Sequence, residues 1–474
     1  MSEMRAAGSK VTTGLGLLAA AAAVGTLLKA WLDVSTTWDV WYYHLPFAAR
    51  IWGIVPADAY AFNAQNQHRY DGFPLLAELV QGLLWAIFRR PEAANLLAFG
   101  SLAAYALFLK RAFRIPLRMA TIALMAVPLV QMHASSCYID LPANALAAAL
   151  VMAAYGLHAR GGPASPREVV GLFALAAATA NMRFQLTPLV AMVLLFVAVR
   201  EMRTLDRRRA ARWAAIAFVA LPIVFATPLK NVVVHHNPVY PMRLSVAGLT
   251  LPYAEETYSD SPPYLESVPQ PVRWAYSLLE VGIRPMTDSA RWTIDQWMPP
   301  SSGGNRMGGA FGAYVVLNLG VLAWLVYKDP SRQARMAVGL FAVLTAMTSV
   351  MPQSHELRYY LYWMMVLVSL NLALLARRPA RDVNAFGLAC ACALLVVLGV
   401  TRAWYVYPSR LSFAWLVHDK VRPAMLEQIR DGERVCFYAE PWTFLYAPTF
   451  HAPLRYGVRE GESASQCGTD RFIE

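Results

Sequence analysis

Long apolar blocks alternate with short polar segments along most of this chain. Each block runs for about 17–22 residues, which is the length a helix needs to cross the hydrocarbon core of a bilayer. Because backbone groups inside lipid must satisfy their own hydrogen bonds, repeated blocks of this length predict helices. Their Ala, Leu and Val residues show no strict alternation, which argues against a membrane β-barrel. The pattern therefore predicts an all-α polytopic membrane protein.

The apolar blocks define about eleven predicted transmembrane helices. They lie near positions 11–32, 93–109, 119–133, 141–157, 169–182, 185–199, 213–229, 310–327, 336–350, 357–376 and 384–404. The polar segments between them include two long predicted external loops, 33–92 and 230–309. We predict a transmembrane bundle over 1–405 and a small α/β segment over 406–474, where "RVCFYA" is typical of a strand.

The charge of the loops predicts which side of the membrane each one occupies. Lys and Arg concentrate in five short segments, at 110–118, 160–167, 200–212, 328–335 and 377–381, and cytoplasmic loops carry such an excess. All five lie inside only if the apolar block 75–88 lies along the outer surface instead of spanning. The N-terminus is then inside and the C-terminus outside, while Arg89 and Arg90 lie outside against the rule.

The composition supports a membrane location and limits the kinds of partner that we expect. Of 474 residues, 57% are hydrophobic and 15% are charged, whereas soluble domains carry about 25% charged residues. The net charge of +12 could indicate nucleic-acid binding, but no DNA- or RNA-reading motif accompanies it, and cytoplasmic loops account for it. We therefore expect membrane lipids and no nucleic acid among the partners.

The five cysteines fall into two groups. Cys137, Cys390 and Cys392 lie in or beside apolar blocks, where cysteine packs as a small hydrophobic residue. Cys436 and Cys467 lie in the polar tail, and they could pair if that tail is outside the cytoplasm.

Candidate catalytic carboxylates lie in the predicted external loops. Asp39 follows the first span in "TTWDVWYYHLP", close to Tyr43 and His44, and Asp140 begins a later span in "YIDLPAN". A carboxylate among aromatic and His residues at the membrane face can act as a general base. The alternative is structural, because Asp often caps helices and aromatic residues form interfacial belts. Asp71, in "NQHRYDGFP", is a further candidate.

Several cations at the external ends of predicted spans run against the positive-inside trend. They are Arg183, Lys230, His235, His236 and Arg358. Snorkelling toward lipid headgroups is one explanation, and binding of a phosphate at the membrane surface is another. Because such cations recur on this side, phosphate binding is favoured for Lys230 and Arg358.

The chain resembles the GT-C superfamily of membrane glycosyltransferases, which use polyprenyl-phosphate-linked sugars. The resemblance covers about positions 10–405 and rests on five short motifs, "TTWDVWYYHLP", "DGFPLLAELVQGLLW", "YIDLPAN", "LKNVVVHHNPVYPM" and "HELRYYLYWM". It implies a GT-C-like bundle in which the second motif forms a surface helix and the fourth starts the large external loop.

The resemblance implies that a sugar moves with inversion from a polyprenyl-phosphate carrier to a glycan, lipid or protein acceptor. Asp39 would take the acceptor proton, with Asp71 as the other candidate base, and Asp140 would orient the acceptor or support His44. The cations that would neutralise the leaving phosphate are Arg183, Lys230 and Arg358. The other candidate substrate-binding residues are Tyr43, His44, His236, Tyr240, His355 and Tyr359.

The resemblance also implies a bacterial inner-membrane protein whose active site faces the periplasm. Some members bind a divalent metal through external carboxylates, but this chain has no obvious Asp-x-Asp pair, so no cofactor is predicted and a divalent metal stays open as an alternative. Two alternatives stay open: an O-antigen ligase or polymerase, and a non-enzymatic lipid or sugar transporter, which would show inverted repeats. The early external aspartates and the "NPVYP" element favour transfer of a single sugar.

Overall fold

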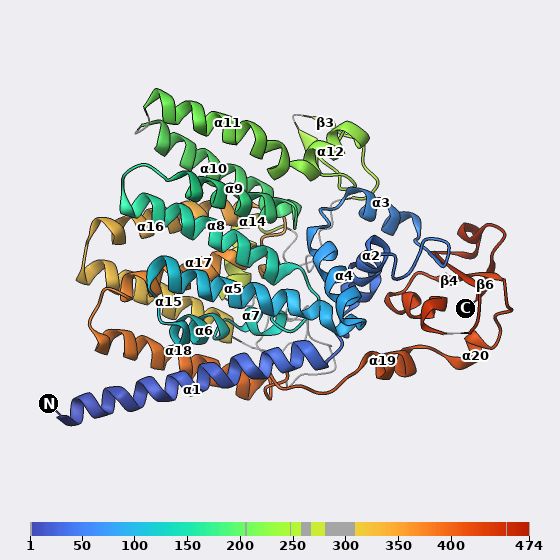
Figure 1. Cartoon of the computed structure of the whole chain (residues 1–474), viewed down its shortest axis with the longest axis horizontal. Coiled ribbons are helices and arrows are strands. Elements are labelled where there is room, and N and C mark those ends of the chain that lie inside the picture. The colour runs from blue at the N-terminus through green and yellow to red at the C-terminus, as the bar shows by residue number, and fades with distance from the viewer. Residues whose placement is uncertain are drawn as a thin grey trace.

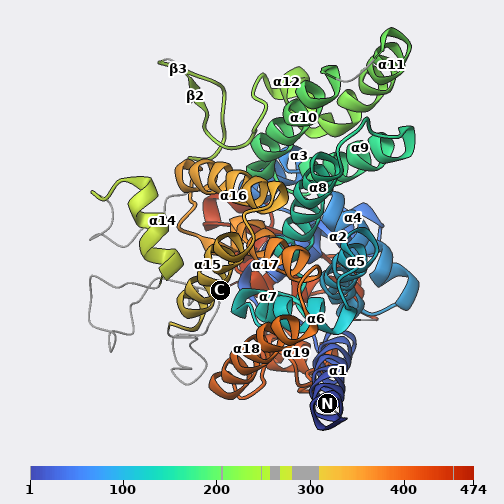
Figure 2. The same cartoon turned by 90° about the vertical axis from the view of Figure 1, so that its left-hand side faces the viewer.

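The computed structural model describes residues 2–203, 206–246, 248–256, 267–279, 309–451 and 453–473. The latter part of the predicted external loop 230–309, from 280 to 308, lies outside them. The described chain forms a helical bundle with a small sheet-containing unit at one end, and the N-terminus lies at the opposite end (Figure 1). Figure 2 views the bundle from the end that carries the N-terminus.

Helices occupy every segment that the apolar pattern predicts as a span. The helices of the bundle are α1 (Ser2–Leu32), α5 (Leu96–Phe113), α6 (Leu117–Met125), α7 (Pro128–His133), α8 (Asp140–Arg160), α9 (Pro166–Ala180), α10 (Thr187–Met202), α11 (Arg207–Val224), α12 (Ala226–His235), α15 (Ala310–Lys328), α16 (Arg332–Val350), α17 (Tyr362–Leu375) and α18 (Ala380–Val400). In the described residues, seven helices are long and apolar enough to cross a membrane, and up to nine if each of two bent pairs is one span. The predicted number of about eleven stays a prediction.

Helix α8 forms the centre of the bundle and begins at the candidate residue Asp140. It packs against α5, α9, α10 and α17, and it lies between its neighbours in both views (Figures 1 and 2). A helix that is apolar all round is expected to be buried on every side, and 78% of its apolar window is buried. The start of α8, with Asp140, therefore has a fixed position to which the loops attach.

Three short helices cover the end of the bundle that faces the sheet: α2 (Leu45–Ile51), α3 (Ala64–Gly72) and α4 (Leu76–Phe88). Helix α4 has 13 residues, so it is about 20 Å long and shorter than a hydrocarbon core of about 30 Å. It bends from α3 by 101°. Gly82 lets α4 approach α2, because a Cβ there would lie 2.5 Å from the carbonyl oxygen of Ala48. Its place on the outer surface, as predicted over 75–88, stays a prediction, because α3 and α4 together are also one of the two bent pairs that could span.

The tail contains the predicted strand and two more, and the first loop adds a fourth. The strands β1 (Tyr60–Ala61), β4 (Arg434–Tyr438), β5 (Gly457–Gly461) and β6 (Arg471–Ile473) form one sheet in the order β1-β5-β4-β6, and all its pairings are parallel. Helices α19 (Phe413–Lys420) and α20 (Pro423–Leu426) precede β4. A disulfide joins Cys436 to Cys467. A small α/β segment at the C-terminal end is therefore confirmed.

The first long loop and the tail share one hydrophobic core. Trp41 and Tyr60, from the loop, are fully buried with Phe444 and Val458 from the tail, and the rings of Tyr60 and Phe444 meet edge-to-face at 5.1 Å. Strand β1 belongs to the loop and pairs with β5 of the tail. The tail therefore holds the loop that carries Asp39.

A buried carboxylate joins the loop to the tail at this sheet. The hydroxyl of Tyr60 donates to Glu460, and the backbone N–H of Asn63 and the amide of Asn66 donate to it at 3.2 and 3.1 Å. Burial raises the pKa of Glu460 above its ordinary value, although these hydrogen bonds act in the opposite direction. The folded protein therefore favours the protonated carboxyl more than the unfolded chain does.

A pH dependence of stability follows. Folding raises the pKa of Glu460. Its contribution to the free energy of unfolding is therefore fully present below the ordinary glutamate pKa and is lost as pH rises through the folded-state pKa. We expect Glu460→Gln, which cannot ionise, to gain thermal stability relative to the wild type as pH rises from about 4 to about 8. Thermal unfolding of both proteins in detergent at several pH values measures this difference. A difference that falls with rising pH would show instead that the fold stabilises the carboxylate.

Candidate active site

The loop after α1 enters the site through a π-helical turn, η1 (Val40–His44). Such wide turns are often found at functional sites. Val40 and Trp41 are fully buried, and the indole N–H of Trp41 donates to the carbonyl oxygen of Ser35 at 2.6 Å. Asp39 precedes the turn with 23% of its side chain exposed. Its neighbours therefore anchor the backbone while its carboxylate stays accessible.

Two of the three candidate aspartates each pair with one of the predicted arginines. Arg358 Nη1 lies 3.3 Å from Asp39 Oδ2, and Arg183 pairs with Asp140, whose side chain is 1% exposed. Neither carboxylate makes a side-chain hydrogen bond that caps its helix. Both arginines are mostly buried, so they do not extend toward lipid headgroups as the snorkelling alternative requires.

The ring of Tyr359 lies against both guanidinium groups. The Cζ atoms of Arg183 and Arg358 lie 4.1 and 4.7 Å from its centroid, within the range of cation–π attraction. Burial alone would lower the pKa of Arg183, but nearby Asp140 and Tyr359 outweigh it and raise that pKa. The site therefore holds two permanent cations beside three carboxylates, because Glu356 Oε2 also lies 3.9 Å from Arg358 Nε.

Asn144 ties these elements together, although the sequence analysis does not single it out. Its amide donates to the carbonyl oxygens of Asp140, at 2.7 Å, and of Arg358, at 2.9 Å, and its Oδ1 accepts from the N–H of Tyr362 at 2.8 Å. It thereby joins the first turn of α8 to the short turn η6 (Leu357–Tyr360). An asparagine one turn inside an apolar block is the sequence signal that identifies it.

His44 has a carboxylate partner that the sequence analysis also misses. Its Nδ1 lies 2.7 Å from Oε1 of Glu78 on α4, and both side chains are 3% exposed. The rings of His44 and Tyr138 meet edge-to-face at 6.0 Å, and the guanidinium of Arg358 lies 5.7 Å from the Tyr138 ring. Glu78 is an acidic residue inside the otherwise apolar block 75–88, which is a visible signal for a buried partner.

Tyr43 borders the site on the side of the large loop. Its pKa is raised well above the ordinary value by burial and then by Asp39, so its hydroxyl stays protonated. The guanidinium of Arg69 lies 5.6 Å from its ring and makes a bidentate pair with Glu255, at 2.6 and 2.9 Å. Arg69 and Glu255 connect the two loops and are not among the predicted site residues.

Asp71, Lys230 and Tyr240 form a second cluster. Lys230 donates to the carbonyl oxygen of Asp71, while the hydroxyl of Tyr240 lies 2.7 Å from Nδ1 of His68. A Cβ on Gly72 would lie 2.4 Å from the carbonyl oxygen of Tyr240, so the "DGFP" and "NPVYP" segments touch through their backbones. The structure thus brings Asp71 and Lys230 together, in contacts separate from the Asp39–Arg358 pair.

The two remaining predicted histidines lie in other surroundings. His236 is exposed and follows α12 with a left-handed backbone conformation, φ 56°. His355 is buried against α14 (Gln270–Leu279), where Ser277 Oγ donates to its carbonyl oxygen at 2.5 Å. The described residues contain no group of three or more His, Cys, Asp or Glu side chains that could hold a metal ion.

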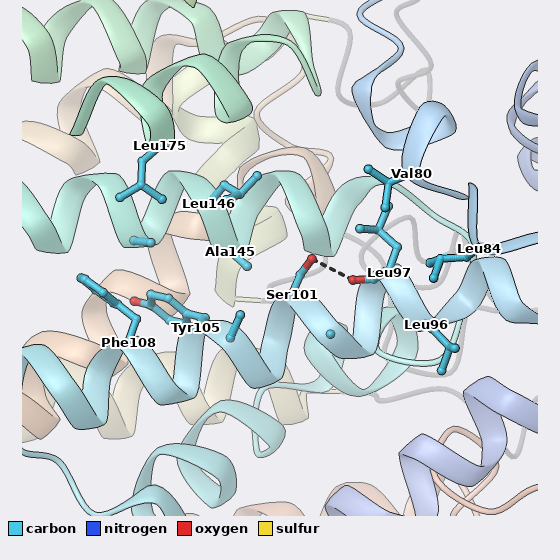
Figure 3. A pocket seen from close by; sticks show the side chains of 13 residues that line it. Val80, Leu84, Leu96, Leu97, Ser101, Tyr105, Phe108, Ala145, Leu146 and Leu175 are labelled. Carbon is cyan, nitrogen blue, oxygen red and sulfur yellow. Dashed lines mark hydrogen bonds between the residues drawn. The ribbon is translucent and has the colours of Figure 1, made fainter. Parts of the chain in front are cut away.

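An apolar cavity of about 380 Å³ lies beside the start of α8, between α4, α5, α8 and α9 (Figure 3). Val80, Leu97, Ala145 and Leu175 line it, and Ala145 lies five residues after Asp140, or about 7.5 Å along the helix. The hydroxyl of Ser101 bonds back to the carbonyl oxygen of Leu97 at 2.7 Å. The walls therefore suit a hydrocarbon chain close to the charged cluster.

Comparison with known proteins identifies the fold through solved structures. No protein-family model and no curated protein matches the chain, but its helical bundle with a small unit at one end is a fold found among solved structures.

The fold is similar to that of ArnT from Cupriavidus metallidurans. The apo structure of ArnT matches with a TM-score of 0.54 and 12% identity over 96% of this chain and 87% of that chain. The same protein bound to undecaprenyl phosphate matches with a TM-score of 0.49 and 13% identity over the same shares. At this identity the likeness establishes the fold, and the activity has to be argued from the site.

Breaking the buried ion pair between Arg183 and Asp140 is expected to lower the free energy of unfolding measurably. Arg183→Met leaves a buried carboxylate without its partner, which costs about 3–5 kcal/mol in the free energy of unfolding. We expect Asp140→Asn/Arg183→Met to recover most of that loss, because no uncompensated charge remains. Unfolding in mixed micelles measures both values. Arg209→Met, which breaks an exposed pair with Asp206, is the matched control and costs under about 1 kcal/mol; equal losses in Arg183→Met and Arg209→Met would contradict the assignment.

Proposed function

We propose that this protein is a glycosyltransferase that moves a sugar from a polyprenyl-phosphate carrier to an acceptor in the cell envelope. The observation that carries the proposal is the pair of buried arginines around Tyr359, which places two guanidinium groups beside the partly exposed carboxylate of Asp39. The fold shared with ArnT, a GT-C enzyme, supports the same class. Arginine suits this role because its planar fork binds phosphate oxygens in pairs.

The proposed reaction takes place on the periplasmic face. The Cys436–Cys467 disulfide lies in the tail that packs on the loop of Asp39, and disulfides persist in oxidising compartments outside the cytoplasm. The basic segments 160–167 and 377–381 follow the ends of α8 and α17 that lie away from this site, in agreement with retention of positive charge inside.

In the proposed step, the acceptor hydroxyl oxygen attacks the anomeric carbon of the sugar from the side opposite the phosphate. The bond between that carbon and the phosphate oxygen breaks, and the phosphate leaves with the electron pair, so the configuration inverts. Asp39 takes the proton of the hydroxyl, and Arg183 and Arg358 stabilise the charge that develops on the phosphate. Positioning and charge stabilisation are enough, because the phosphate is already a fair leaving group.

The Asp39–Arg358 contact gives the proposed base a way to become available. It is a single contact of 3.3 Å, longer than a strong charge-assisted hydrogen bond. A donor phosphate offers Arg358 a stronger partner, so its binding releases the Asp39 carboxylate toward the acceptor. Asp140 stays with Arg183 and positions it. Asp39 is preferred to Asp71 as the base because Asp39 lies beside the arginines.

The apolar cavity between α4, α5, α8 and α9 (Figure 3) is the proposed site for the first part of the prenyl chain. Its wall residue Ala145 follows Asp140 on α8, so a carrier could place its phosphate at the arginines and its chain against these helices. Apolar burial of this kind contributes about 0.8 kcal/mol for each methylene group.

The test of the function is the rate of sugar transfer by the purified protein. We expect Asp39→Asn to lower kcat by about 10²–10⁴-fold, because a general base is lost, while Asp71→Asn, the matched control, stays close to the wild type. Donors are a single-sugar polyprenyl phosphate and a polyprenyl-diphosphate oligosaccharide. Wild-type rates in Asp39→Asn would contradict the base assignment. Transfer only from the diphosphate donor would favour a ligase or polymerase, and transport without transfer would favour a transporter.

A second prediction concerns the prenyl chain. Gly100 lines the cavity of Figure 3, and nothing lies within 4 Å of a Cβ placed there, so we expect Gly100→Phe to narrow the cavity. We expect KM for a long-chain donor to rise about tenfold or more, with little change for a donor whose chain is too short to reach the cavity. Gly320→Phe on α15, which is equally open, is the control. Equal effects on long and short donors would place the chain elsewhere.

A further inference from the structure

A second and larger cavity lies at the other end of the bundle. Its volume is about 920 Å³, and it is formed by α5, α8 and α9 together with the start of α16 and the end of α17. Helix α8 runs from Asp140, in the candidate active site, to Arg160, on the rim of this cavity. Those ends are about 30 Å apart at 1.5 Å per residue, so this cavity is not part of the active site.

The cavity has an apolar interior and a basic rim. Phe108, Met152 and Leu172 belong to its wall. The charged residues at the rim are Arg114, Arg160, Arg377 and Glu168. Three arginines and one glutamate leave an excess of two positive charges.

The one acidic residue at the rim, Glu168, already has hydrogen-bond partners within the protein. Glu168 accepts from Arg160, with Nη2 to Oε2 at 3.1 Å, and from the backbone N–H of Ser165 at 2.8 Å in the capping box of α9. Within the described residues, no acidic side chain pairs with Arg114 or Arg377. These two guanidinium groups are therefore available to an anion from outside the protein.

Retention of basic residues on one side of the membrane explains why arginines end these helices, but it does not explain the cavity beneath them. The cavity opens on the flank of the bundle, because its wall residues Ala112 and Gly171 are exposed and Ala153 is half-buried. In a membrane protein, that flank faces lipid. A ligand that fits has an anionic head for the arginines and a hydrocarbon chain for the interior.

We propose that this cavity binds an anionic phospholipid of the adjacent leaflet, with its phosphate at Arg114 and Arg377 and an acyl chain among α5, α8 and α9. A free phosphate ion would use only the rim and leave the apolar interior to water. A zwitterionic lipid would bring its own cation to a rim that already has excess positive charge. The charge and the apolar depth together favour the anionic lipid.

This site is independent of the sugar-transfer proposal. It adjoins the smaller cavity of Figure 3, since both are lined by Phe108 and Leu175, but its rim lies at the opposite end of α8. Loss of lipid binding and loss of sugar transfer can therefore be measured separately.

The experiment titrates the purified full-length protein in detergent with phosphatidylglycerol or phosphatidylcholine and counts bound lipids by native mass spectrometry. We expect phosphatidylglycerol to bind more tightly. Arg114→Gln/Arg377→Gln should weaken it by about fivefold for each charge removed. Gly171→Trp should also weaken it, because nothing lies within 4 Å of a Cβ on Gly171 and the indole would occupy the interior.

Matched controls decide the outcome. Arg111→Gln removes an exposed arginine of the last turn of α5 that does not line the cavity, and Gly320→Trp adds an indole on α15; both should bind phosphatidylglycerol as the wild type does. Equal binding of the two lipids, an equal loss in Arg111→Gln, or unchanged binding in Gly171→Trp would each overturn the proposal. If the double arginine variant does not fold, as judged by its thermal unfolding, the lipid preference of the wild type and the Gly171→Trp result still decide.

Discussion

Charge buried at the site end of the bundle must be neutralised where it lies, because an unpaired ion in a low-dielectric interior is strongly unfavourable. Two aspartate–arginine pairs meet this requirement, and each joins segments that are far apart in the chain. Asp140 belongs to α8, Arg183 to the turn before α10, and Arg358 to the turn before α17, while Asp39 comes from the first loop. The positions of the loops over the bundle therefore follow from where these charges can be paired.

A second constraint acts on the same loop from the opposite side. The aromatic residues after Asp39 enter a core that the tail completes, and strand β1 adds to the sheet of the tail. The loop is thus held between the ion pairs and the small α/β unit. Its carboxylate keeps partial exposure because every neighbour in the π-helical turn is fixed elsewhere. Such preorganisation is what positioning of a reactive group requires.

The sequence predicts the features that depend on local pattern. Apolar blocks of membrane length predict the helices, and "RVCFYA" predicts β4. The partners of the site residues are harder to predict from the sequence, because each partner comes from a distant part of the chain. Glu78, Asn144 and the Arg69–Glu255 pair carry only weak local signals, and a strand of two residues such as β1 has no periodicity to detect. Asp71 and Lys230 each lie in a recognisable motif, but motif order alone does not show that they form a cluster separate from that of Asp39.

Strands β1 and β5 pair although they come from opposite ends of the chain. This separation has a consequence for the order in which the parts assemble during biosynthesis. Asp39 meets Arg358 across 319 positions, and Tyr60 meets Glu460 across 400. Chains emerge from the ribosome starting with the N-terminus, so the first loop reaches its side of the membrane long before either partner has been made. Until the tail has been made, Trp41 and Tyr60 of the loop lack the contacts with Phe444 that complete their core. A ribosome that stalls after α18 would leave a nearly complete set of membrane helices whose first loop still lacks the tail that completes its core.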